Sequence, residues 1–84
     1  MKRARILVER EKTHGDFRKN AQISREIKDL FARHGYKRMD PVFTEVLDMG
    51  AMKLARILSG QERFKDHWVD LGHYFILGSE ACED

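Results

Sequence analysis

Three polar residues stand at positions where an amphipathic helix would carry an apolar side chain. When residues are placed about 100° apart around a helix, Asn20 lies in the apolar arc of one predicted helix, Lys53 in that of the next, and Asp70 on a face of the last. An unpaired charge is costly to bury. We therefore expect Lys53 to form an ion pair with Asp70 or with Asp66. Asn20 would complete the hydrogen bonds of this cluster.

These residue types suit the recognition of a phosphorylated ligand. Lys53 and Arg56, three residues apart, present a point charge and a planar fork, both of which bind phosphate well. Asp66 and Asp70 are one helical turn apart and could hold Mg²⁺, which often takes one or two carboxylates together with water and phosphate. Asp70 could also orient an attacking water, and Asn20 could hydrogen-bond a base or sugar. The alternative role for the cluster is a buried salt bridge that only fixes the helix register.

Four helices are predicted to position these residues, because helix formers dominate and strand-like alternation is absent. Their expected bounds are about Met1–Lys12, Phe17–His34, Pro41–Ser59 and His67–Leu77, followed by a frayed acidic tail at Ser79–Asp84. The expected N-caps are Asp16, Asp40 (followed by Pro41) and Asp66, and the expected stops are Gly35, Gly60 and Gly78.

The length of the chain allows one domain with a thin core. Its 84 residues include a single cysteine, Cys82, which cannot form a disulfide within the chain. The last predicted helix is apolar nearly all round, so other helices must cover it on several sides. We therefore predict an all-α, four-helix antiparallel bundle over residues 1–84, completed by self-association as a homodimer or homotetramer.

The charge distribution is uneven. Residues 1–39 carry 12 Lys and Arg against 5 Asp and Glu, whereas residues 40–84 carry 4 against 9, and the net charge is +2. The basic half raises a nucleic-acid hypothesis, which ranks last because no recognition-helix motif accompanies it. Attraction between the two halves is the simpler interpretation. No apolar run approaches the roughly 20 residues of a membrane span, and we expect a cytoplasmic protein.

Three stretches together resemble a family of small phage and prophage proteins of unknown function. They are residues 15–20 (GDFRKN, against G-D-x-x-x-N), residues 53–56 (KLAR, against K-[IL]-A-R) and residues 66–74 (DHWVDLGHY, against D-x-W-x-D-[IL]-x-x-Y). They occur in the same order as in the family and cover most of residues 13–78. These phage proteins are in turn similar to the MazG-like all-α nucleoside triphosphate pyrophosphatases.

The resemblance implies a helical dimer or tetramer and Mg²⁺-dependent hydrolysis of a nucleoside triphosphate to monophosphate and pyrophosphate. On the matching positions it implies Asp66 and Asp70 as metal-binding and catalytic carboxylates, and Asp16 as a ligand contact. Glu45, in Glu45-x-x-Asp48, stands for the E-x-x-D of the MazG-like enzymes and would be a further metal ligand. Their E-E-x-x-E motif does not occur in this chain.

Two functions therefore stay open at the level of the sequence. The first is a MazG-like nucleotide-binding protein of phage or prophage origin, with or without pyrophosphohydrolase activity. The second is a non-enzymatic phage accessory bundle whose polar cluster is purely structural. For Glu45 and Asp48 a solvated helix face is the simpler interpretation, with metal binding as the alternative.

Overall fold

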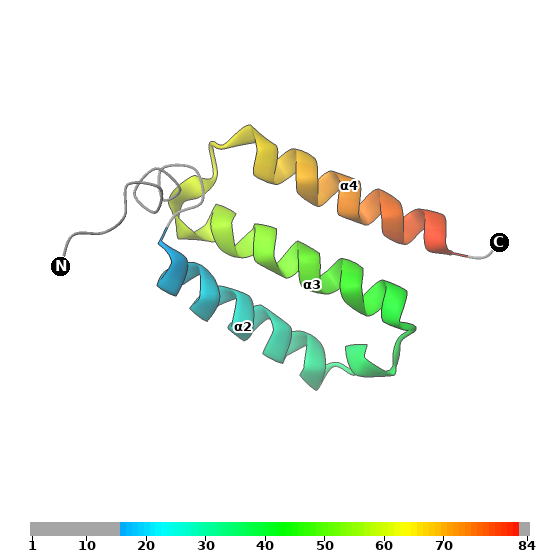
Figure 1. The fold of residues 1–84 in the computed structure, drawn as a ribbon. Coiled ribbons are helices and arrows are strands. Elements are labelled where there is room, and N and C mark those ends of the chain that lie inside the picture. Colours follow the sequence, from blue (N-terminus) through cyan, green and yellow to red (C-terminus); the bar gives the residue numbers. More distant parts are fainter. Residues whose placement is uncertain (1–15, 83–84) are drawn as a thin grey trace.

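The computed structural model describes residues 16–82, which are helical apart from short connections (Figure 1). In chain order the helices are α2 (Phe17–Arg33), α3 (Pro41–Arg56) and α4 (Lys65–Ala81), with single turns η1 (Tyr36–Arg38) and η2 (Ile57–Gln61) between them. No strand occurs among these residues, so the all-α prediction is confirmed for residues 16–82. The predicted first helix, about residues 1–12, lies outside the described residues.

Helices α2 and α3 begin where the sequence predicts. Asp16 Oδ1 accepts a hydrogen bond from the Arg18 amide at 2.9 Å, and Asp40 Oδ1 accepts one from the Val42 amide at 3.0 Å. Each aspartate thereby satisfies an amide that the first turn of a helix leaves without a backbone acceptor. Pro41 is the first residue of α3, where its missing amide proton costs nothing.

Two glycines adopt left-handed conformations after α2 and α3, at the positions predicted as stops. Gly35 follows α2 with φ 80°, and Gly60 lies in η2 with φ 106°. Glycine enters this left-handed region without the clash that a Cβ would cause. Helix α3 itself ends at Arg56, after which η2 departs from helical geometry at Ser59 and Gly60.

Helix α4 begins earlier than predicted. It starts at Lys65, its N-cap is Phe64 in an extended conformation, and Asp66 is therefore not the N-cap. Instead, Asp66 lies in the first turn, where its negative charge interacts favourably with the helix dipole.

Helix α4 also continues past the predicted stop at Gly78 and ends at Ala81. The prediction of a frayed tail from Ser79 is therefore wrong for residues 79–81. A Cβ placed on Gly78 would lie 3.5 Å from Val46 Cγ1. This glycine thus marks a close approach of α4 to α3, and not the end of a helix.

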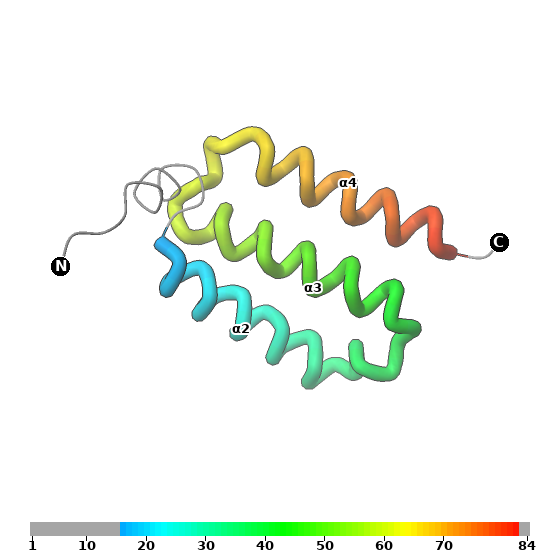
Figure 2. Tube along the Cα trace, in the orientation of Figure 1, coloured from blue at the N-terminus to red at the C-terminus, as the bar shows by residue number. Residues whose placement is uncertain are grey.

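The three helices form a single layer with α3 in the middle (Figures 1 and 2). Helix α3 packs on α2 along one edge and on α4 along the other, and the chain reverses direction at each connection. The three helices are therefore antiparallel to their neighbours over residues 16–82, and the remaining helix of the predicted four-helix bundle falls outside the described residues.

The core of this layer is small. Ala51 and Ala55 of α3 are completely buried, and only a few larger apolar side chains, including Val46, Ile57 and Leu71, are buried with them. Gly50 brings α4 close, since a Cβ there would lie 3.5 Å from Leu71. In contrast, eleven large hydrophobic side chains among the described residues remain 39–75% exposed.

The layer has two broad faces, because α2 and α4 cover α3 only at its two edges. Stepping around each helix by about 100° per residue assigns side chains to one face or the other. We call one side the polar face, and it is formed by Glu45, Met52, Lys53, Arg56, Asp66 and Asp70. We call the opposite side the apolar face, and it is formed by Ile27, Leu30, Leu54, Leu58, Trp68 and Phe75.

None of the helices over residues 16–82 combines the length and the apolar character that a membrane-spanning segment needs.

Candidate ligand site on the polar face

An ion pair joins α3 to α4 on the polar face. Lys53 Nζ lies 2.7 Å from Asp70 Oδ2, which confirms the predicted pairing of these two residues. The Lys53 side chain is 12% exposed, whereas that of Asp70 is 41% exposed. The pair is therefore sheltered on the lysine side and open to solvent on the aspartate side.

The surroundings of Asp70 favour its charged form. The hydrogen bond from Lys53 lowers the pKa of the Asp70 carboxyl, and the charges of Lys53, His73 and His67 act in the same direction. Partial burial opposes them. Asp70 is thus a carboxylate at neutral pH, available to a cation or as a hydrogen-bond acceptor, and it is not suited to act as a proton donor there.

Two histidines flank Asp70 along α4, three residues before it and three residues after it. His67 is almost completely buried, and its ring packs against Phe64 with the ring centroids 4.8 Å apart. His73 is exposed. The influence of these histidines on Asp70 was not predicted from the sequence. The i−3 and i+3 spacing around Asp70 was the signal that could have indicated it.

Asn20 has a different partner from the one that the sequence suggested. The hydroxyl of Ser59 hydrogen-bonds to Asn20 Oδ1 and lies 3.1 Å from the carbonyl oxygen of Arg56. Ser59 is six residues beyond Lys53, which is about 9 Å along a helix axis. Lys53 reaches α4, while Asn20 belongs to α2, so the structure divides the predicted cluster between the two sides of α3.

Other predicted ligand contacts lie near the ion pair or serve the fold. Arg56 is half-buried and follows Lys53 by three residues on the polar face, and Asp66 is exposed one turn before Asp70. These four residues occupy one end of the α3–α4 pair. Asp16, in contrast, caps α2 through the Arg18 amide.

The structure does not bring Glu45 to the other proposed metal ligands. Lys53 pairs with Asp70, whereas Val46, next to Glu45, packs at Gly78. Glu45 is therefore about two turns of α4 away from Asp70. Within residues 16–82, no three His, Cys, Asp or Glu side chains lie close enough together to hold a metal ion. On the described residues, a Mg²⁺ site can use the carboxylates of Asp66 and Asp70 but not that of Glu45.

Asp48 is not on a solvated face, and that interpretation was wrong for this residue. Its side chain is half-buried, and Oδ1 is buried without a hydrogen-bond partner. Burial first, and then the hydrogen bond and charge of Asp48, raise the pKa of the Tyr36 hydroxyl. Helical periodicity does not reveal this burial, because the central helix of a layer has two buried edges and its apolar arc indicates only one.

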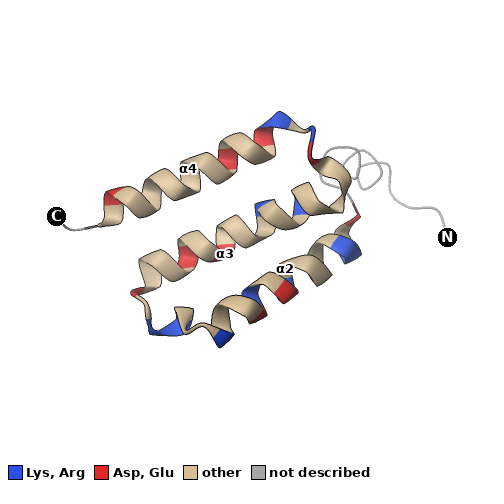
Figure 3. Cartoon of the chain, turned by 180° about the vertical axis from the view of Figure 1, so that it is seen from behind, with Lys and Arg blue, Asp and Glu red and all other residues tan. Residues whose placement is uncertain are grey.

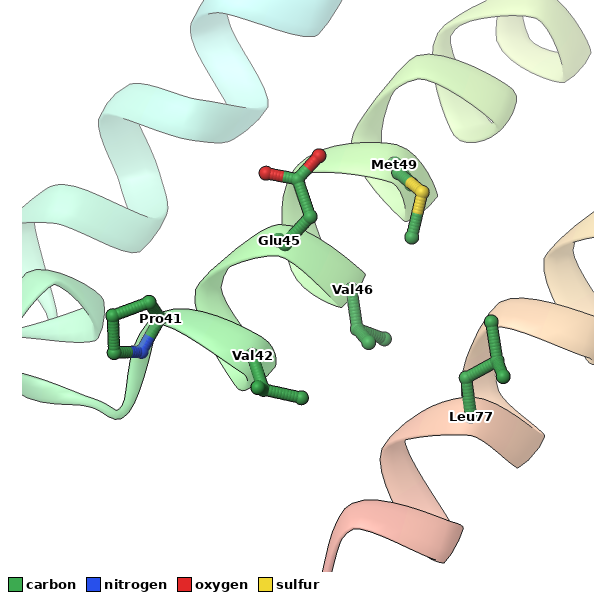
Figure 4. Close-up of a pocket in the computed structure, with 6 residues that line it drawn as sticks. All are labelled: Pro41, Val42, Glu45, Val46, Met49 and Leu77. Carbon is green, nitrogen blue, oxygen red and sulfur yellow. The ribbon is translucent and has the colours of Figure 1, made fainter.

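A shallow groove of about 540 Å³ lies at the other end of the α3–α4 pair (Figure 4). Its lining residues are mostly apolar: Pro41, Val42, Glu45, Val46, Met49 and Leu77. Glu45 contributes its only charge. The groove therefore lacks the cations that a phosphorylated ligand needs, and Lys53 and Arg56 remain the better candidates for that role.

Comparisons of this chain with protein-family models, with curated proteins and with solved structures find no match.

Proposed function

We propose that this chain binds a nucleotide on the polar face, through the end of the α3–α4 pair that carries Lys53, Arg56, Asp66 and Asp70. The observation that carries the proposal is the Lys53–Asp70 ion pair, whose aspartate is open to solvent while its lysine is sheltered. A phosphate that approaches from solvent would meet two cations, and a Mg²⁺ ion that accompanies it would meet two carboxylates.

Binding would exchange one set of charge pairs for another. Lys53 and Arg56 would neutralise phosphate oxygens, and Asp70 would turn from Lys53 toward the metal ion. Mg²⁺ would polarise the phosphate anhydride and help to orient a water, which is the chemistry of a nucleoside triphosphate pyrophosphohydrolase. Two of the three stretches that resemble the small phage and prophage proteins, residues 53–56 and 66–74, contain all four residues, and the similarity of those proteins to the MazG-like enzymes supports the same assignment. A phage or prophage origin and a cytoplasmic location belong to this proposal.

A thermal-shift screen of each ribonucleoside and deoxyribonucleoside triphosphate, with and without Mg²⁺, tests the binding. At 100 times Kd a ligand stabilises the folded chain by about 2.7 kcal/mol, which corresponds to roughly 10 °C or more in Tm for a domain of this size. Asp70→Asn and Arg56→Ala should remove the shift. Arg33→Ala, an exposed arginine in the last turn of α2, should retain it.

Hydrolysis is tested separately on any nucleotide that binds. Pyrophosphate release that requires Mg²⁺ and disappears in Asp66→Asn would support an enzyme. Binding without release would reduce the proposal to a nucleotide-binding protein. No thermal shift with any nucleotide would remove the proposal.

A second function is favoured by the same ion pair. Lys53 already has a counter-ion at 2.7 Å, so the pair can serve only to fix the register of α4 on α3 in a non-enzymatic phage accessory bundle. In that case the double variant Lys53→Met, Asp70→Leu should keep the fold and its Tm, and no nucleotide should shift the Tm of the original chain.

A further inference from the structure

The apolar face of the layer is continuous over all three helices. On α4, Phe75 lies about 140° around the helix from Asp70 and 160° from Leu77, which both belong to the polar side. Phe75 also approaches Gly50 of α3, at 3.7 Å from a Cβ placed there. Phe75 and its neighbours therefore cover the side of the layer opposite to the ion pair.

Helix α2 contributes to the same face. Arg25 acts electrostatically on Tyr36, which hydrogen-bonds to Asp48. Ile27 and Leu30 point about 140–160° around α2 from Arg25. Since α2 runs antiparallel to α3, this direction is the side on which Leu54 and Leu58 of α3 lie.

The face carries large side chains and few charges. Leu30, Leu58, Trp68 and Phe75 are 45–63% exposed. No Asp, Glu, Lys or Arg of α3 or α4 falls on this arc, and α4 has none at all between Asp70 and Glu80 (Figure 3). An exposed apolar surface of this extent marks an interaction site.

The indole nitrogen of Trp68, on this face, has its hydrogen-bond partner within the chain. It donates to the carbonyl oxygen of Glu62 at 2.8 Å. The ring can therefore enter a dry interface without losing a bond to water.

We propose that the apolar face is the interface with a second copy of this chain, which packs layer on layer to give a six-helix homodimer. A helix of 17 residues is about 25 Å long, and three helices about 9 Å apart span a further 25 Å. The projected area of the face is therefore on the order of 600 Å². Its accessible area is larger because the side chains make it uneven, which brings it near the roughly 800 Å² that each partner contributes to a standard interface.

Symmetry and charge favour a second copy over other occupants. A two-fold contact places the same surface on both sides. The arcs of α3 and α4 carry no charged side chain that would repel its own copy, and on α2 the charges nearest to Leu30 are of opposite sign, Lys19 and Glu26. A lipid surface fits less well, because α4 carries Asp66, Asp70 and Glu80 against Lys65 alone, and anionic lipids attract basic helices. The dimer leaves both polar faces outward, so this inference does not rest on nucleotide binding.

The first test uses the full chain at equilibrium. Sedimentation equilibrium should show a dimer, and the emission of Trp68, the sole tryptophan, should shift to the blue as concentration rises. Tm should also rise over about a hundredfold range of concentration. A monomer with concentration-independent emission and Tm would overturn the proposal, as would monomers that gather only on lipid vesicles.

The second test is a matched pair of charged variants on opposite faces of the layer. Leu58→Glu places a carboxylate on the apolar face and should weaken dimerisation about a hundredfold or more. Met52→Glu, 47% exposed on the polar face, should leave the dimer unchanged. Circular dichroism checks helicity, and Leu30→Glu on α2 replaces Leu58→Glu if that variant fails to fold. Equal effects of both substitutions, or an assembly that neither one weakens, would contradict this interface.

Discussion

The polar face and the apolar face are built by the same three helices, yet they present different chemistry. The polar face holds an ion pair, further charged side chains and a shallow groove. The apolar face presents leucine and aromatic side chains with no charged residue on its α3 and α4 arcs. One layer of helices cannot bury both of its faces. The comparison therefore shows that the two faces expose different chemistry: charged side chains beside an apolar groove on one, and a largely uncharged apolar surface on the other.

The largest expected effect on stability separates two leucines of α4, one in the core and one on the polar side. Leu71 is 7% exposed and packs toward Gly50, while Leu77 lines the groove and is 50% exposed. We expect Leu71→Ala to lower the free energy of unfolding by about 2–4 kcal/mol, because it leaves a cavity. Leu77→Ala should cost less than about 1 kcal/mol. Urea unfolding at matched concentrations measures both, and similar losses would show that the groove side is packed as firmly as the core.

Gly72 of α4 should tolerate an added methyl group. A Cβ placed on Gly72 meets nothing within 4 Å. Gly72→Ala should therefore stabilise the chain by about 0.5–1 kcal/mol through helix propensity. Gly60→Ala is the contrasting change, because its φ of 106° is unfavourable for alanine and stability should fall by about 1 kcal/mol. A loss of stability in Gly72→Ala would indicate that the second copy packs over Gly72.

The stability that the Lys53–Asp70 ion pair contributes should be lost at acid pH. Because the folded state lowers the pKa of Asp70, the stability that this residue contributes is present above its unfolded pKa of about 3.9 and is lost as pH falls through the folded value. Unfolding of the original chain and of Asp70→Asn should therefore differ at neutral pH and converge below about pH 4. A constant difference down to the lowest pH would contradict the linkage.

The smallest expected effect is a change in a tyrosine titration. Burial and Asp48 raise the pKa of Tyr36 above 10.0, so the folded state loses stability as pH rises through that folded pKa. Asp48→Asn should lower the Tyr36 pKa toward its ordinary value. Absorbance at alkaline pH, in a Tyr74→Phe background that leaves one tyrosine, follows this titration. An unchanged Tyr36 pKa would assign the whole shift to burial.

The sequence predicted most of the fold through local signals. Asp16 and Asp40 cap their helices, and Gly35 and Gly60 adopt the left-handed conformations expected of stops. The ends of α4 were missed, because tertiary packing overrode local preference. Gly78 stays helical where α4 meets Val46, so residue type alone suggested a stop that the fold does not use.

Part of the candidate site was predictable for a similar reason. A lysine within an apolar stripe requires a partner. This argument named Asp70 or Asp66, and the structure pairs Lys53 with Asp70. The contact between Asn20 and Ser59 depends on how the chain leaves helical geometry in η2, which no periodicity reveals. The burial of Asp48 requires knowledge that α3 is flanked on both sides.

The central position of α3 also bears on how fast the chain folds. The two most extensive contacts in the layer, α2 with α3 and α3 with α4, join helices that follow one another in the sequence. Such a topology has a low contact order and closes only short loops, and helical domains of this kind fold in microseconds to milliseconds. If two chains must then meet, the encounter between them would become the slow, concentration-dependent step.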